Sequence, residues 1–158
     1  MLGKAAQNAV DSGNHEVADY LRLKAANDAI RAVGVGWLID TIIEIAGEAV
    51  RQHAAIIIER EEAHNFARGN SNMVGSLLRV RHGVRCLTIE AGWTRTPRDG
   101  IMAKGALAFA RITHYGLPKM SAEFRLVHAE TLPRWIDAGE AVVDSGELRR
   151  HFDVLIGG

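Results

Sequence analysis

The chain of 158 residues contains few residues that break helices or cross-link chains. Its three prolines, Pro97, Pro118 and Pro133, all lie in the second half, so no proline interrupts a helix before residue 97. The single cysteine, Cys86, excludes an internal disulfide and favours a reducing compartment. The formal net charge is zero, which excludes a global basic field that would hold the whole surface against nucleic acid or anionic lipid.

Long hydrophobic runs are also missing. The most apolar segment, residues 37–50, carries Asp40, Glu44 and Glu48 and is too short and too charged to cross a bilayer. The first ten residues lack the apolar core of a signal peptide. We therefore expect a cytoplasmic protein with no membrane partner. The apolar share of 47% and the charged share of 24% are typical of a globular domain, and the length predicts a single domain over residues 1–158.

The first part of the chain has the periodicity of helices. Apolar residues recur at near-helical spacing from Val17 to Val33. A second apolar stretch runs from Trp37 to Phe66, and Gly34 lies between the two stretches in the position of a C-terminal cap. We therefore predict a helical hairpin over residues 1–68, made of two long helices preceded by a shorter helix from Lys4 to about Asp11.

The stretch from Trp37 to Phe66 is apolar around most of its circumference. Such a wide apolar face requires contact on more than one side. We expect this helix to lie between the first helix and a sheet. The alternative is that its remaining apolar surface forms a homodimer through the 37–66 helix.

From about Leu77 onward the sequence alternates between apolar and polar residues, as strands do. Leu77 to Ala91 is typical of a hairpin with His82 and Gly83 as its turn, which pairs Leu78 with Leu87. The predicted core face carries Leu78, Val80, Leu87 and Ile89. The predicted outer face carries Arg79, Arg81, Cys86, Thr88 and Glu90.

The remaining chain is predicted to complete a sheet segment over residues 74–158. Its expected elements are strands over Ala106–Tyr115 and Ala122–His128, a short helix over Arg134–Val143, a charged turn over Glu147–Arg150 and a strand-like end over Phe152–Ile156. The predicted fold class is α+β, with two long N-terminal helices packed on an antiparallel sheet of about four or five strands and short C-terminal helices.

Basic residues around the hairpin and the following loop form the principal candidate site. Residues 71–98 contain five arginines and one acid, Glu90. Arginine side chains bind phosphate and carboxylate groups in a forked geometry, and Trp93 could stack on a base. The predicted ligand-binding residues are Arg79, Arg81, Arg85, Trp93, Arg95, Arg98 and Lys104. The alternative is a solvated sheet face whose arginines pair with neighbouring acids.

Three functions are compatible with these patterns. The first is a non-enzymatic binding or regulatory module that holds an anionic partner (nucleic acid, a nucleotide or an acidic protein surface) on the basic hairpin and loop. The second is a small enzyme with a pocket between the sheet and the central helix, for which the candidate catalytic residues are Cys86, His114 and His128. The third is a homo-oligomeric assembly protein. The sequence has no phosphate-binding loop or dinucleotide fingerprint. Of the possible zinc ligands His82, Cys86, His114 and His128, only the first two are closely spaced, so we predict no cofactor and no metal site.

Overall fold

The computed structural model describes residues 15–52, 54–130 and 132–157. These residues form one long helix, a six-stranded antiparallel sheet and a shorter C-terminal helix. The helices are α2 (His15–Arg51) and α3 (Ser145–Ile156). The strands, which neighbour one another in chain order, are β1 (Ile57–Arg68), β2 (Ser71–His82), β3 (Arg85–Trp93), β4 (Ala108–His114), β5 (Ala122–Val127) and β6 (Arg134–Ile136). Short 3-10 turns lie in the loops: η1 (Pro97–Asp99), η2 (Ala103–Gly105) and η3 (Pro118–Met120). The α+β class and the antiparallel sheet are confirmed, whereas the second long helix and the smaller strand count are wrong.

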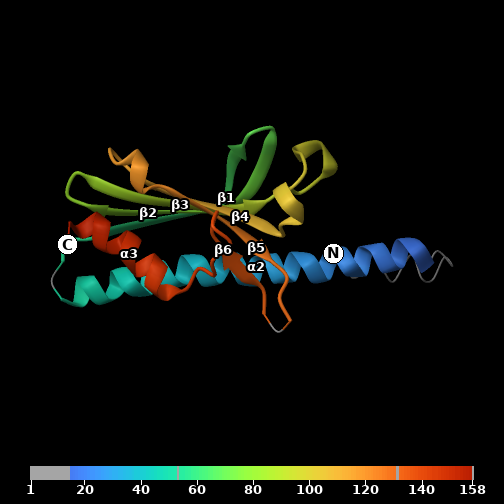
Figure 1. Cartoon of the computed structure of the whole chain (residues 1–158), viewed down its shortest axis with the longest axis horizontal. Helices are drawn as coiled ribbons and strands as arrows, with labels where there is room; N and C mark the ends of the chain where they lie inside the picture. Colours follow the sequence, from blue (N-terminus) through green and yellow to red (C-terminus); the bar gives the residue numbers. More distant parts are fainter. Residues whose placement is uncertain (1–14, 53, 131, 158) are drawn as a thin grey trace.

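Both helices lie on the same face of the sheet, here called the inner face (Figure 1). The second half of α2 crosses beneath the strands beside α3, whereas its first turns extend beyond the sheet (Figure 1). The main core fills the space between the helices and the sheet, and its fully buried members include Leu38, Ile42, Ile89, Phe124 and Leu148. In the part of the chain that the structure describes, no helix is long and apolar enough to cross a membrane.

Gly34 and Gly36 do not end the helix as predicted, because α2 continues through both. The reason lies in the sheet. A Cβ atom on Gly34 would lie 2.5 Å from Cδ2 of Leu126 in β5, so α2 approaches the sheet too closely there for any side chain. Gly34 is thus a close-contact residue and not a helix cap. After this point Leu38, Ile39, Ile42 and Ile45 of α2 are buried in the core, whereas Trp37 and Val50 are exposed.

The predicted helix from Trp37 to Phe66 is wrong in its second half. Helix α2 ends at Arg51, and residues 57–68 form the edge strand β1, so the predicted helical hairpin over residues 1–68 does not form. Three consecutive isoleucines, residues 56–58, favour a strand, and pairing with β2 sets Glu59 opposite Arg79. The predicted short helix from Lys4 to Asp11 lies outside the described residues.

The β2–β3 hairpin has the predicted faces but not the predicted register. Its two-residue loop is Gly83-Val84, with Gly83 at φ +62°, and Leu78 pairs with Ile89 instead of Leu87. Each residue of β2 thus pairs two positions farther along β3 than predicted. A shift of two residues leaves every side chain on the same face of the sheet. The four predicted core residues of this hairpin are therefore all buried, as expected.

The C-terminal segment differs most from the prediction. Residues 134–136 form strand β6 where a helix was expected, and residues 145–156 form helix α3 where a turn and a strand were expected. The carboxylate of Asp144 caps α3 by accepting a hydrogen bond from the Glu147 amide at 3.0 Å. Leu148, Phe152 and Leu155 recur at helical spacing and are all buried against the core.

The other face of the sheet, here called the outer face, is concave because β1 and β2 bend over it. The register of β1 shifts between Glu61 and His64, where Ala63 adopts a left-handed φ of 54°. Gly75 and Gly92 lie directly opposite each other in β2 and β3, and a Cβ on Gly75 would lie 1.8 Å from the carbonyl oxygen of Ala91. The absence of side chains here lets the strands bend, and a second apolar cluster of Phe66, Met73 and Phe109 fills the outer face.

Candidate functional site

The structure does not bring the seven predicted ligand-binding residues together. Arg79, Arg81 and Arg85 lie near the β2–β3 turn, whereas Arg95 and Arg98 lie in the loop that follows β3. Arg85 lies ten residues before Arg95, and Arg79 is paired with Thr88, seven residues before it. At the rise of an extended strand these separations are about 33 and about 23 Å. Lys104 lies farther along the same loop, with its ammonium 3.8 Å from the carboxylate of Glu140.

The arginines near the β2–β3 turn contact groups of the protein itself. Arg81 forms an ion pair of 2.9 Å with Glu59 of β1, and Arg79 lies in register with the same glutamate. Arg85 donates a hydrogen bond of 2.9 Å to the carbonyl oxygen of Val154 in α3. These contacts favour the ion-paired sheet face over a docking surface at this end of the sheet.

Arg95, at the other end of β3, is held in a defined position. Its guanidinium carbon lies 3.9 Å from the ring centroid of Trp93, and its Nη2 donates a hydrogen bond of 2.9 Å to the carbonyl oxygen of Val74. Trp93 is only 7% exposed. The indole therefore supports the guanidinium from below and does not offer a free face for stacking on a base.

The loop beyond Arg95 is closed by Asp99. One carboxylate oxygen of Asp99 accepts hydrogen bonds from the Thr96 amide at 3.0 Å and the Thr96 hydroxyl at 3.1 Å. The same oxygen accepts a bond of 3.3 Å from the Arg95 amide. This carboxylate therefore fixes the backbone of residues 95–99 and with it the direction of the Arg95 side chain.

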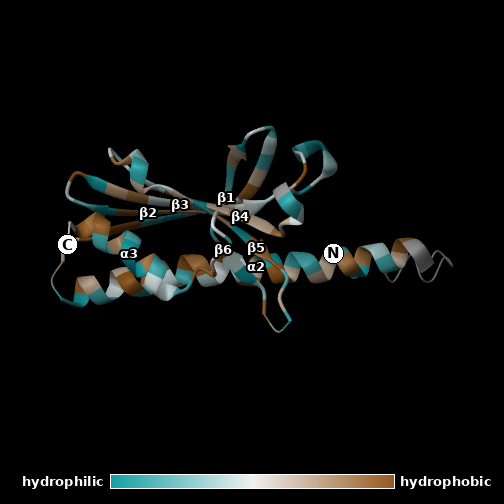
Figure 2. Ribbon diagram, viewed as in Figure 1, coloured by the Kyte–Doolittle hydropathy of each residue, from teal (hydrophilic) through white to brown (hydrophobic). Residues whose placement is uncertain are grey.

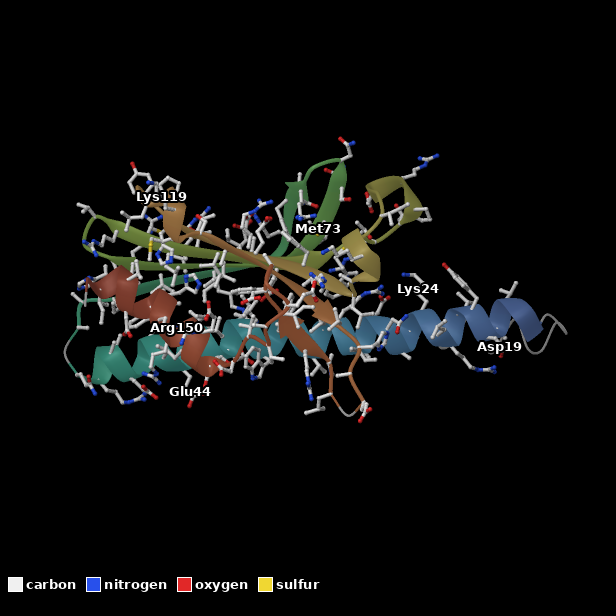
Figure 3. All side chains as sticks on the ribbon, viewed as in Figure 1. Asp19, Lys24, Glu44, Met73, Lys119 and Arg150 are labelled. Atoms are coloured by element: carbon white, nitrogen blue, oxygen red, sulfur yellow. The ribbon has the colours of Figure 1, made fainter. Side chains whose placement is uncertain are left out.

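A groove of about 280 Å³ lies between this loop and the first turns of α2, and we call it the helix–loop groove. One wall comes from the loop and includes Thr94, Arg95 and Thr96. The other wall comes from one side of α2 and consists of Tyr20, Leu23, Lys24, Asn27 and Arg31. Figure 3 labels Lys24 on the part of α2 that extends beyond the sheet.

The helical wall of the groove was not predicted from the sequence. The signal that could have found it is spacing, because residues 20, 24, 27 and 31 share one face of a helix. Nothing in the sequence joins that face to a loop some 70 residues later, since the connection depends on the path of α2 beneath the sheet. Arg31 makes this connection directly: its Nε donates a hydrogen bond of 2.7 Å to the carbonyl oxygen of Leu107.

The helix–loop groove has an excess of positive charge. Its lining contains three cations, Lys24, Arg31 and Arg95. Two acids adjoin it: Asp28 forms ion pairs with Arg31 at 2.7 Å and with Lys24 at 3.5 Å, and Asp99 accepts the hydrogen bonds of the loop. Burial lowers the pKa of Arg95; Asp28 opposes this effect and the positive charge of Arg31 adds to it. Arg31 and Arg95 therefore repel each other across the groove while both stay protonated, and an entering anion would relieve that repulsion.

The three candidate catalytic residues are not brought together either. Cys86 lies on the outer face, with its sulfur 3.7 Å from the Thr88 hydroxyl, whereas His114 is buried on the inner face beside His151. His128 follows the end of β5, opposite the start of β4, and His114 ends β4. Six residues of extended strand separate those ends, or about 20 Å. Within the described ranges, no three His, Cys, Asp or Glu side chains gather in a way that could hold a metal ion.

Comparison of the chain with protein-family models, with curated proteins and with solved structures finds no match.

Proposed function

We propose that the protein is a non-enzymatic binding module that holds an anionic partner in the helix–loop groove. The observation that carries the proposal is the convergence of Lys24, Arg31 and Arg95 on one groove, where two adjoining acids, Asp28 and Asp99, leave one positive charge in excess. Two of these cations are positioned before any ligand arrives, Arg31 by the Leu107 carbonyl and Arg95 by Trp93 and Val74. Preorganised cations bind anions with less loss of side-chain entropy than free ones.

The form of the groove favours a phosphate-bearing chain, and we take single-stranded nucleic acid as the partner. The groove is open along its length, and its hydroxyl and amide groups suit a polar backbone better than an apolar ligand. Tyr20, which is 63% exposed on the same wall, offers an aromatic face for a base. Cations along a groove with an adjoining aromatic side chain are the usual elements of single-strand binding. We therefore expect the base contact at Tyr20 and not, as predicted from the sequence, at Trp93.

Fluorescence anisotropy with a labelled oligothymidylate tests the proposal. We expect Lys24→Gln to weaken binding by about fivefold, since a lost charge contact of this kind is worth about 1 kcal/mol. The salt slope of the logarithm of the binding constant should fall by about 0.7 for each phosphate contact removed. Lys119→Gln is the matched control, because Lys119 is an exposed lysine in η3 and lines no part of the groove.

Equal losses of affinity in the Lys24 and Lys119 variants would show that the binding is non-specific electrostatic attraction and would contradict the proposal. The absence of measurable binding at low salt would also overturn it. Arg95→Lys adds a second check. It keeps the charge but loses the planar guanidinium that stacks on Trp93, so it should weaken binding without changing the salt slope.

Homo-oligomeric assembly is a second candidate, favoured by apolar side chains that α2 leaves uncovered. Val33 is 64% exposed and Trp37, one turn later, is 41% exposed. Figure 2 shows apolar bands on the part of α2 that extends beyond the sheet. Light scattering coupled to gel filtration tests this candidate: a dimer mass that Val33→Glu reduces to the monomer supports it, and a monomer mass at high concentration ends it.

A further inference from the structure

A second concave site lies on the outer face of the sheet, and it shares no lining residue with the helix–loop groove. It is a pocket of about 180 Å³ between β4, β5 and the loop that contains η2, and we call it the outer pocket. Its floor is apolar and is formed by Met73, Met102 and Phe109. Figure 3 labels Met73, which lies in β2 on the bent β1–β2 hairpin.

The floor combines aromatic rings with thioethers. Met73 and Phe109 are 1% and 6% exposed and belong to the apolar cluster of the outer face, against which Met102 packs from the loop. The guanidinium of Arg68 lies 4.7 Å from the ring centroid of Phe109 and forms one end of the pocket wall. Methionine side chains adapt to the outline of a bound molecule and make favourable contacts with aromatic rings. The floor therefore suits a flat apolar body.

The acids of the rim already have partners. Glu123 accepts a hydrogen bond of 3.3 Å from Nε of Arg68, and Nε of Arg111 lies 3.9 Å from the same carboxylate oxygen. One oxygen of Asp137 accepts bonds of 2.9 Å from the amides of Gly139 and Ala141. Both carboxylates therefore already contact donors of the protein itself.

Two exposed cations, Lys104 and Arg68, lie at the rim. Lys104 is 69% exposed and lies 3.8 Å from Glu140, whose oxygens also accept hydrogen bonds of 2.5 and 2.7 Å from Arg125. Arg68 contacts Glu123 through its Nε, and its guanidinium lies above the Phe109 ring. Both cations therefore lie at the edge of an apolar floor.

We propose that the outer pocket binds a small organic anion with an aromatic body, its ring on the methionines and Phe109 and its anionic group between Arg68 and Lys104. The volume fits one or two fused rings and excludes a polymer chain. The inference does not depend on the proposed function, because the two sites use different residues and different ligand chemistry.

Two fluorescent probes of nearly identical body test the proposal. 8-Anilino-1-naphthalenesulfonate carries a sulfonate, and N-phenyl-1-naphthylamine is its uncharged counterpart. We expect the sulfonate to bind more tightly. Lys104→Gln and Arg68→Gln should each weaken binding of the sulfonate by about fivefold and leave binding of the neutral probe unchanged. Lys24→Gln in the helix–loop groove should change the affinity for neither probe. Ala138→Trp, at an exposed position in the pocket lining, should exclude both.

Methionine methyl NMR locates the probe independently of affinity. The chain has four methionines, and Met73 and Met102 line the outer pocket whereas Met120 lies in η3. With methyl-labelled methionine we expect the sulfonate to shift the signals of Met73 and Met102 and to leave that of Met120 in place. Equal affinities for the two probes, or a shift of Met120 without the other two, would overturn the proposal.

Discussion

The indole Nε1 of Trp135 donates a hydrogen bond of 2.9 Å to the carbonyl oxygen of Gly34, 101 residues earlier in the chain. The bond joins β6 to the middle of α2 at the point where Leu126 of β5 also meets the helix. Both contacts need a helix surface without a side chain. Gly34 therefore sets the closeness of α2 to the sheet, and with it the position from which the helix reaches the helix–loop groove.

Replacement of Gly34 should separate this packing role from helix propensity. The Cβ of Gly34→Ala would overlap the buried end of Leu126, so we expect a loss of about 1–3 kcal/mol in the free energy of unfolding. Gly36→Ala is the matched control, because nothing lies within 4 Å of its Cβ. It should gain about 0.5–1 kcal/mol from helix propensity. Urea denaturation measures both, and a Gly34→Ala protein as stable as the Gly36→Ala protein would contradict the assignment.

The bend of the sheet predicts a larger effect at Gly75. The Cβ of Gly75→Ala would lie 1.8 Å from the backbone oxygen of Ala91, which cannot turn away as a side chain can. We expect the variant to lose at least about 3 kcal/mol or to fail to fold, as measured by thermal unfolding followed by circular dichroism. Gly139→Ala is the control, because its nearest contact is an ordinary 3.4 Å to an Asp137 oxygen. Similar melting temperatures for the two variants would show that the strands tolerate a side chain at the bend.

The buried pair His114 and His151 predicts a loss of stability in acid. Their ring nitrogens lie 2.9 Å apart, and burial together with the charge of His151 lowers the pKa of His114 to about 4. Burial also lowers the pKa of His151, against the raising effect of Glu147, and Arg150 adds to the lowering. An unfolded histidine titrates near pH 6.5. Between about pH 6.5 and 4 the unfolded chain therefore binds protons that the folded chain does not.

The free energy of unfolding should accordingly be at its full value above about pH 6.5. It should fall as the pH decreases, by up to about 1.4 kcal/mol per pH unit for each histidine. We expect His114→Gln with His151→Gln to flatten this dependence. Comparison near pH 8, where both histidines are neutral, gives the structural cost of the substitutions separately. Parallel curves for the two proteins from pH 8 to 4 would exclude the histidine pair as the cause.

Tyr20 should contribute to oligonucleotide binding through its ring. Tyr20→Ala should weaken the binding of an oligothymidylate by about 1–3 kcal/mol, the usual contribution of one stacked base. Tyr20→Phe should retain most of the affinity. Tyr115→Ala is the matched control, because Tyr115 is 77% exposed and lies outside the groove lining. Anisotropy titrations at fixed salt measure all three. If Tyr20→Phe lost as much affinity as Tyr20→Ala, the contact would depend on the hydroxyl and not on stacking.

Local patterns predicted the features that depend on neighbouring residues. Alternation in β2 and β3 predicted which side chains are buried, and it held although the turn was misplaced by one residue, because the resulting slip preserved the faces. Periodicity failed where a distant partner decided the outcome. Residues 57–68 form a strand because β2 pairs with them, and Phe152 to Ile156 form the end of a helix because the core buries the Leu148, Phe152 and Leu155 face of α3.

The candidate site divides in the same way. The sequence by itself determined an α+β protein with an antiparallel sheet and a basic loop at Arg95, because short-range alternation and composition carry that information. Only the tertiary structure decided that Lys24 and Arg31 face this loop and that Arg81 and Arg85 engage other groups of the protein. Electrostatic interactions depend on the distances between charged groups. These distances are set by the close packing of α2 against the sheet, which the sequence alone does not specify.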